Sequence, residues 1–294
     1  MITFVAVKQR PGLTLTTVSA VACGLLIALP AAGVWPLLLT EFRAPAASVA
    51  EVAFLAIYLW WMSGGGPPAR LHAVRVGSFR RTHLSGREWG WGILAALTFA
   101  ATVHAAIVLV FRVEPFPAQA FHRGYALTAI PSPFLQWVVC VVSALSAAVC
   151  EEVGFRGYLQ RPIESAGAPR LAVLMSAVVF MLVHVNKSWA LLAMVPIVFG
   201  AGVLLGSLAR ASGTLLFGML GHWMMDIGLF AYWWTQIAGT FSERPFARTG
   251  WDRALTIECA VFIVVLTLLV TAILRLQKLA AIANTRLAAE PAAR

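Results

Sequence analysis

The chain has 294 residues, of which 60% are hydrophobic and 12% are charged, and its formal net charge is +10. Soluble domains carry about a quarter of their residues as charged side chains, so this chain cannot cover itself with a polar surface. Its basic residues stand mainly in short segments between apolar runs, which is typical of membrane orientation and argues against a nucleic-acid partner. The composition therefore predicts an integral membrane protein that lies in the lipid bilayer.

Eight apolar segments are candidates for membrane helices, since about 20 apolar residues cross a bilayer as a helix. In chain order they are residues 15–39, 48–63, 89–111, 134–155, 171–186, 189–209, 214–238 and 255–274. The first exceeds the roughly 7–15 apolar residues of a secretory signal and is expected to be retained. The predicted fold is an all-α polytopic bundle of about eight transmembrane helices, forming one integral membrane domain over 1–294.

The basic residues also predict an orientation. If the N-terminus is cytoplasmic, 15 of the 22 Lys and Arg residues fall on the inner side and 7 on the outer side. Basic residues concentrate in cytoplasmic segments, so both termini are expected in the cytoplasm, with 64–88 a basic cytoplasmic loop and 276–294 a cytoplasmic tail. The compact chain, rich in Ala and Arg, suggests a bacterial cytoplasmic (inner) membrane.

Ionisable side chains inside apolar runs are informative, because each costs about 2.5–3.5 kcal/mol in lipid. The first group of them follows Cys150 and contains Glu151, Glu152 and Arg156. On a helix Glu152 and Arg156 share a face and can pair, whereas Glu151 points about 100° away and stays available as a base. Taken alone, this segment is equally well explained as a charge cluster that anchors a helix end.

Two further segments carry such residues. His184 follows Phe180 by four positions and is the only titratable residue of its apolar run; alone, it is better explained as a packing residue. His222 and Asp226 are four apart on one helix face, and a structural polar pair is a serious alternative. Together, the three segments favour a common site with water, where a carboxylate and an imidazole take a proton and a second imidazole stabilises an oxyanion.

The three motifs follow one another in a fixed order along the chain. They read Glu-Glu-x-x-x-Arg, Phe-x-x-x-His and His-x-x-x-Asp on successive apolar segments, which resembles the CPBP (CAAX protease and bacteriocin-processing, or Abi) family that includes the type II CAAX prenyl endopeptidases. The matching residues are Glu151, Glu152, Arg156, Phe180, His184, His222 and Asp226. The resemblance covers 134–238, where the catalytic core is expected.

The resemblance implies an intramembrane endopeptidase whose active site lies near the cytoplasmic side of the membrane. The implied roles are general base for Glu151, orientation of the water for His184, and oxyanion stabilisation for His222 and Asp226. The other three matching residues would support them. The family has Asn or Asp at the position of Asp226, and an aspartate donates a hydrogen bond only when it is protonated; otherwise it would orient His222 or bind a metal.

No cofactor is required for water activated by a glutamate. Zinc is an alternative, because Glu151, His184, His222 and Asp226 are of ligand type, although the HExxH signature is absent. The expected substrate is a membrane-anchored protein or a peptide precursor, cleaved in a membrane-associated or C-terminal segment. The alternatives are a non-catalytic immunity or scaffold protein that binds a peptide in the same cavity, and a proton-coupled transporter, which the lack of two related halves disfavours.

The predicted boundaries leave one inconsistency in depth. Glu151 falls near the cytoplasmic end of its span and His184 toward the outer end of the next, so straight helices do not bring them together. Either the fifth helix begins in the cytoplasm or the fourth continues further than drawn. Outside the three motifs, Glu51 and Glu258 are expected to reach the membrane interface, and His104 is expected to be a packing residue.

Overall fold

The computed structural model describes residues 13–41, 44–69, 72–79, 84–119, 127, 130–188 and 192–289. The regular elements in these ranges are helices: α1 (Leu13–Glu41), α2 (Ala44–Met62), α3 (His72–Ser78), α4 (Gly86–Val113), α6 (Pro133–Glu151), η3 (Glu152–Gln160), α7 (Arg161–Ser165), α8 (Pro169–Ser188), η4 (Leu192–Met194), α9 (Val195–Ser212), α10 (Leu216–Gly228), η5 (Leu229–Trp234), α11 (Phe246–Thr249) and α12 (Arg253–Ala289).

Five helical stretches within the described residues are long and apolar enough to cross a membrane: Pro45–Met62, Gly86–Val113, Pro133–Ser165, Leu192–Ser212 and Arg253–Ile282. Two shorter apolar helices, Leu13–Leu29 and Pro169–His184, accompany them. The prediction of an all-α polytopic membrane bundle is confirmed. The number of eight spans stays a prediction.

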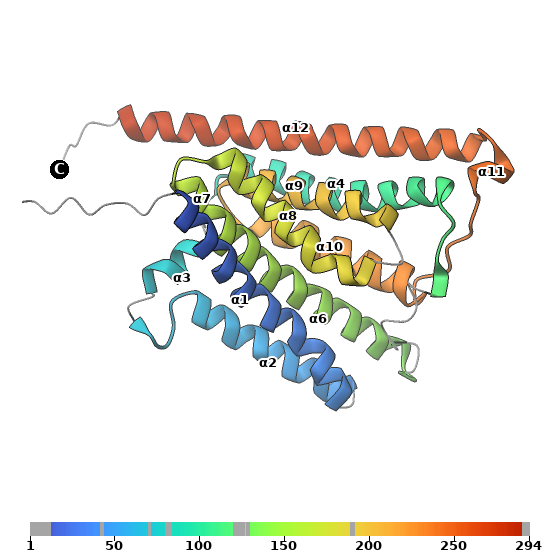
Figure 1. The fold of residues 1–294 in the computed structure, drawn as a ribbon, viewed down its shortest axis with the longest axis horizontal. Coiled ribbons are helices and arrows are strands. Elements are labelled where there is room, and N and C mark those ends of the chain that lie inside the picture. The colour runs from blue at the N-terminus through green and yellow to red at the C-terminus, as the bar shows by residue number, and fades with distance from the viewer. Residues whose placement is uncertain are drawn as a thin grey trace, which may run out of the picture.

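The long helices run side by side, and those that carry the three motifs lie at the centre of the bundle (Figure 1). Helix α10 packs against both α4 and α6, α8 packs against η3 and α9, and α12 lies along α4. The start of α1, helix α3, the turn between α7 and α8, and the end of α12 lie at one end of the bundle, and α11 lies at the other (Figure 1). This agrees with the predicted topology; that this end faces the cytoplasm, and that the membrane is a bacterial inner membrane, stay predictions.

Local sequence signals explain where several helices begin and end. Ser85 caps α4 and forms a capping box, because its hydroxyl accepts from the Glu88 N–H while its own N–H donates to the Glu88 carboxylate at 2.8 Å. Helix α6 starts with Ser132 as its cap and Pro133 in its first turn. Helix α9 ends at Ser212 and is capped by Gly213, whose φ of 65° favours glycine. These signals set the ends of the helices that carry or support the site.

Small residues allow α1 to lie directly on the helix that carries Glu151. A Cβ on Gly24 would lie 2.7 Å from the Cβ of Leu159, and a Cβ on Gly154 would lie 2.6 Å from the Cβ of Ala28. Lipid supplies no hydrophobic force between helices, so close backbone packing at small residues takes its place. As a result η3 is buried on its α1 side.

The predicted basic loop 64–88 is more structured than an orientation signal requires. It contains α3, and Arg75 in that helix is buried, with Nη2 donating to the carbonyls of Gly64 and Gly66 at 3.1 and 2.9 Å. Its guanidinium also lies 4.8 Å from the centroid of the Trp61 ring. One arginine therefore folds the glycine-rich turn back onto α2. Positions 70–71 and 80–83 of the loop, and 290–294 of the predicted tail, lie outside the described residues.

The expectation that Glu51 reaches the membrane interface is wrong. Its exposed fraction is only 3%, and its Oε2 accepts a hydrogen bond from the Ser143 hydroxyl at 3.3 Å. A buried carboxylate is tolerated where a facing helix supplies a donor, and α6 supplies one here. By contrast, Glu258 lies at the end of the bundle and pairs with Arg112, while His104 accepts a hydrogen bond from the Trp233 indole, in keeping with a packing role.

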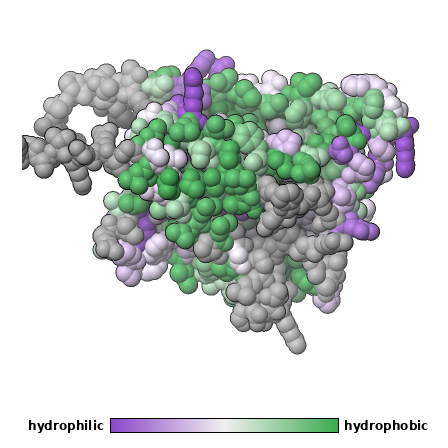
Figure 2. Space-filling view, viewed as in Figure 1, coloured by the Kyte–Doolittle hydropathy of each residue, from purple (hydrophilic) through white to green (hydrophobic). Residues whose placement is uncertain are grey.

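The surface is consistent with a lipid environment. Figure 2 shows hydrophobic residues over the middle of the visible face, with hydrophilic residues gathered toward its two ends. Leucine, isoleucine and valine side chains of α12 are exposed along the bundle, among them Ile257, Ile263, Val264 and Leu274. Such a band would be unstable in water and matches the hydrocarbon core of a membrane. The protein is therefore integral to a membrane.

Candidate active site

The helix that carries Glu151 does not end where the hydrophobic pattern ends. Helix α6 continues without a break through η3 and α7 to Ser165, and α8 starts at Pro169 after a short turn. Glu151 lies 14 residues before Ser165 (165 − 151), and His184 lies 15 residues after Pro169 (184 − 169). Nearly equal counts on two antiparallel helices give the two residues the same depth, so the second explanation offered for the depth problem is confirmed. Glu151 stands near the middle of its helix, and its predicted place near the end was wrong.

The continuation is made by an unusual turn. Residues Glu152–Gln160 form a π-helix, directly after Glu151, and a second π-helix starts three residues after Asp226. Such turns are rare and occur frequently at functional sites. The Phe155 carbonyl within the first π-helix accepts a hydrogen bond from the Ser176 hydroxyl of α8 at 3.1 Å. Thus α8 stabilises the irregular backbone beside the site.

The three motif-bearing helices bring their polar side chains together, as the sequence predicted. Glu151 Oε2 lies 3.7 Å from His184 Nε2 and 3.9 Å from His222 Nε2. Both distances are too long for a direct hydrogen bond, and Glu151 Oε2 is buried without a hydrogen-bond partner among the described residues. Asp226 Oδ2 lies 3.5 Å from the same His222 Nε2. One carboxylate oxygen thus faces two imidazoles from two other helices.

Glu152 is already engaged. Its Oε1 accepts from Arg156 Nη1 at 2.8 Å and from His222 Nδ1 at 3.0 Å, and all three side chains are at most 2% exposed. The predicted pairing of Glu152 with Arg156 is confirmed. The carboxylate fits against α10 because residue 218 is glycine: a Cβ on Gly218 would lie 2.9 Å from Glu152 Oε2. Glu152 is therefore fixed by two partners, whereas Glu151 Oε2 makes no direct hydrogen bond among the described residues.

The hydrogen bonds also define which nitrogen of each histidine faces Glu151. His184 Nδ1 lies 2.7 Å from the Phe180 carbonyl, which can only accept, so Nδ1 carries the proton. His222 Nδ1 likewise donates to the Glu152 carboxylate. Both rings consequently direct Nε2 toward Glu151, where it can accept or donate according to the protonation of the ring.

Phe180 forms a platform beneath these groups. Its ring centroid lies 4.5 Å from that of His184 and 5.8 Å from that of His222. The guanidinium carbon of Arg156 lies 4.7 Å from the same ring, within the range of a cation–π interaction. One aromatic side chain therefore contacts a residue from each of the three motifs.

The donor set does not support a zinc site. Among the residues that the structure describes, no group of three or more His, Cys, Asp or Glu side chains is arranged to hold a metal ion. The four cysteines, Cys23, Cys140, Cys150 and Cys259, are free thiols. Glutamate-activated water and a metal-dependent mechanism both stay hypotheses.

Sequence reasoning missed the residues that support the site without being ionisable. Gly218 makes room for Glu152, and Ser176 binds the π-helix. Neither had a signal of its own, because glycine and serine occur throughout membrane helices for many reasons. Only the partners across the helix interfaces identify them.

Comparison with known proteins agrees with the geometry. Residues 132–228 match the family model described as Rce1-like type II CAAX prenyl endopeptidase. No curated protein and no solved structure matches the chain. The matched segment runs from the start of α6 to the end of α10 and contains every residue of the three motifs. The resemblance to CAAX-type membrane proteases is therefore confirmed over residues 132–228, which match the Rce1-like type II CAAX prenyl endopeptidase domain.

Proposed function

We propose that this protein is an intramembrane endopeptidase in which Glu151 activates a water molecule for attack on a peptide bond. The observation that carries the proposal is the position of Glu151 Oε2, a buried carboxylate oxygen with no hydrogen-bond partner among the described residues, which faces the Nε2 atoms of His184 and His222. A carboxylate that makes no direct hydrogen bond through this oxygen and lies beside two imidazoles has the chemistry that amide hydrolysis needs.

In the first step, Glu151 takes a proton from water while the water oxygen attacks the carbonyl carbon of the substrate. His184, with its proton fixed on Nδ1 by the Phe180 carbonyl, accepts a hydrogen bond from that water through Nε2 and orients it. The carbonyl oxygen becomes an oxyanion as the new C–O bond forms. Glu151 then holds the proton that the leaving amine needs.

In the second step, the oxyanion collapses, the C–N bond breaks and Glu151 delivers its proton to the leaving nitrogen. His222 stabilises the oxyanion through Nε2–H when its ring is protonated, and Glu152 supports that state by accepting the Nδ1–H. Asp226 lies 3.5 Å from His222 Nε2, so as a carboxylate it orients this ring, and as a carboxylic acid it donates to the oxyanion itself.

The position of the site restricts the substrate. Glu151, His184 and His222 lie at the centre of a bundle whose outer surface is apolar, so a scissile bond must be brought to membrane depth. A peptide does this when a lipid group or a membrane-spanning segment anchors it. We therefore propose membrane-anchored proteins or peptide precursors as substrates; the family name refers to prenylated CAAX ends, which makes lipid-modified C-terminal peptides the first to test.

The proposal is tested with purified, detergent-solubilised protein and synthetic peptides that end in a lipid-modified cysteine plus three residues, with the unmodified peptide as control. Mass spectrometry is expected to show one new C-terminus, formed faster from the lipid-modified peptide. Glu151→Gln and His184→Ala should each abolish cleavage, while thermal unfolding shows that both variants are folded. Full activity in both variants would show the proposal to be wrong.

The same experiment separates the enzyme from a non-catalytic scaffold that binds a peptide in this cavity. A scaffold would retain the peptide intact, and its binding would survive Glu151→Gln as long as the bundle is folded. Cleavage by the wild type together with binding but no cleavage by the Glu151→Gln variant supports the enzyme.

A further inference from the structure

Two buried side chains of η3 bind two glycines of α9 in register. Arg156 and Gln160 are four residues apart, as are Gly202 and Gly206. Arg156 Nη2 donates to the Gly202 carbonyl at 3.3 Å, and Gln160 Nε2 donates to the Gly206 carbonyl at 2.8 Å. Both donor side chains are 0% exposed. These two hydrogen bonds, one helical turn apart, join η3 to α9.

The orientation of the Gln160 amide is well defined. Its Nε2 also donates to Glu164 Oε1 at 2.7 Å, so both amide hydrogens are used and the nitrogen is distinguished from the oxygen by its two acceptors. The oxygen side faces α9, where a Cβ on Gly206 would lie 2.8 Å from Gln160 Oε1. Gly206 therefore admits the amide, and the amide in turn holds α9 in one register.

The same register reaches α8, the helix of His184. A Cβ on Gly202 would lie 2.9 Å from the Cα of Ala177, so α8 and α9 touch backbone to backbone at this point. A shift of α9 along its axis would move the Gly202 carbonyl away from Arg156. It would also disturb the close backbone packing of α8 against Gly202. Arg156 would then lose one of the contacts that keep it on Glu152, and Glu152 holds His222.

We propose that Gln160 is a positioning residue of the active site, an inference that rests on the function proposed above. By binding the Gly206 carbonyl it sets the register of α9, through which the Gly202 carbonyl, Arg156 and Glu152 hold the His222 ring in place. Gln160 itself touches none of the reacting groups. Its loss therefore lowers turnover through the orientation of His222 and leaves the binding of substrate unchanged.

The test compares Gln160→Met with Gln136→Met. Gln136 offers a matched control, because its Nε2 donates to the Ile130 carbonyl at 2.7 Å near the start of α6, away from the three motifs. Both variants lose an amide-to-carbonyl hydrogen bond and both should unfold at a lower temperature. Only Gln160→Met should lower kcat, on the order of tenfold because small misplacements of catalytic groups have large effects, with KM unchanged.

A second measurement does not depend on activity. In protein labelled with ¹⁵N-histidine, the NMR signal of the His222 Nδ1 proton reports its hydrogen bond to Glu152; it should shift in Gln160→Met and stay in place in Gln136→Met. If the wild type cleaves no peptide, the proposed function fails but this signal still decides the positioning role. An unchanged signal and an unchanged kcat in Gln160→Met would overturn the inference.

Two more variants keep the test decisive. Should Gln160→Met fail to fold, Gln160→Asn retains the amide but shortens its reach to Gly206, and is expected to give the same loss of turnover and the same NMR shift. The double variant Gln160→Glu with Glu164→Gln restores a donor and an acceptor between these two positions but leaves the Gly206 carbonyl without its donor. It should remain impaired; full turnover would mean that the contact with Glu164, rather than the register of α9, is what matters.

Discussion

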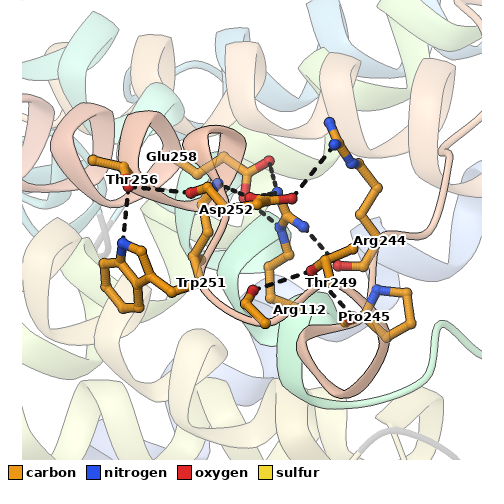
Figure 3. A network of polar contacts seen from close by, with 10 residues as sticks. Arg112, Arg244, Pro245, Thr249, Trp251, Asp252, Thr256 and Glu258 are labelled. Atoms are coloured by element: carbon orange, nitrogen blue, oxygen red, sulfur yellow. Dashed lines mark hydrogen bonds and ion pairs between the residues drawn. The ribbon is translucent and has the colours of Figure 1, made fainter.

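Among the residues that the structure describes, two buried arginines bind carboxylates, with different consequences. Arg112, near the end of α4, is 3% exposed and holds Glu258 with two hydrogen bonds of 2.6 and 3.0 Å, while its Nη1 donates to the Arg244 carbonyl at 2.6 Å (Figure 3). Arg156, within the bundle, is 0% exposed and holds a single oxygen of Glu152. The first network joins α4, the segment before α12 and α12 itself; the second joins the helices of the site.

The difference lies in the groups beside each arginine. The network around Arg112, which we call the outer network, contains Glu258 and Asp252. Their side chains are 26% and 20% exposed, and both pair with an arginine. Beside Arg156 stands another carboxylate, Glu151, which the arginine does not bind and which faces two imidazoles. A network in which every carboxylate binds an arginine stabilises the packing of the helices. A network in which one carboxylate instead faces imidazoles can perform acid–base chemistry. Four predictions test this distinction.

The largest effect is expected from Arg156→Met. It leaves Glu152 buried without its cation, which should destabilise the protein by about 3–5 kcal/mol and abolish cleavage. Thermal unfolding in detergent measures the first and peptide cleavage the second. Adding Glu152→Gln removes the unpaired charge and should recover much of the stability without recovering cleavage; recovery of both would mean that the pair has no part in the chemistry.

Arg112→Met should have a smaller effect. Its partner carboxylates are partly exposed and can be solvated, so we expect a loss of roughly 1–3 kcal/mol from the missing hydrogen bonds and an unchanged kcat in the folded fraction. The same unfolding and cleavage assays apply. A loss of kcat in folded Arg112→Met protein would show that the outer network influences the site, and would contradict its purely structural role.

Phe180→Leu should cost still less stability. The substitution keeps a buried apolar side chain but removes the ring that contacts His184, His222 and Arg156, so we expect a total loss of about 0.5–1.5 kcal/mol. Because both imidazoles lose their platform, kcat should fall while the unfolding temperature changes little. Phe180→Tyr, which keeps the ring, is the control and should retain more activity than Phe180→Leu.

The smallest effect concerns the pH dependence of the outer network. The Leu255 N–H, together with the guanidinium groups of Arg112 and Arg244, holds the pKa of Asp252 below its ordinary value. A lowered folded-state pKa means that Asp252 contributes stability above its unfolded pKa, near 4, and that this contribution is lost as the pH falls through the folded value. Asp252→Asn should abolish this acid-sensitive part of the unfolding profile and leave cleavage unchanged. An acid profile identical to that of the wild type would contradict the assigned contacts.

Much of the membrane architecture could be predicted because lipid imposes simple rules on the chain. Apolar length located the helices, and the spacing of Glu152 and Arg156 predicted their pairing, since four residues bring two side chains to one helix face. The cost of burying polar groups also predicted that Glu151, His184 and His222 converge. Each of these inferences depends on properties of a single helix or on a general penalty.

Other features depend on contacts between helices and had no local signal. The π-helix from Glu152 to Gln160 packs against α1 and α8, and hydrophobic periodicity does not encode it. Glu51 looked like an interface residue because its hydroxyl donor, Ser143, is 92 positions away in sequence. No local pattern in the sequence marks Gln160, because its role depends on the glycines of α9 that lie opposite it.

The most direct measurement is the turnover of the Glu151→Gln variant beside that of Glu258→Gln, each purified in detergent and first shown to be folded. Removing the Glu151 carboxylate should eliminate cleavage without lowering the unfolding temperature, whereas removing the Glu258 carboxylate should lower the unfolding temperature while cleavage continues at the wild-type rate. Cleavage by Glu151→Gln at a rate close to that of the wild type would contradict the assignment of Glu151 as the base.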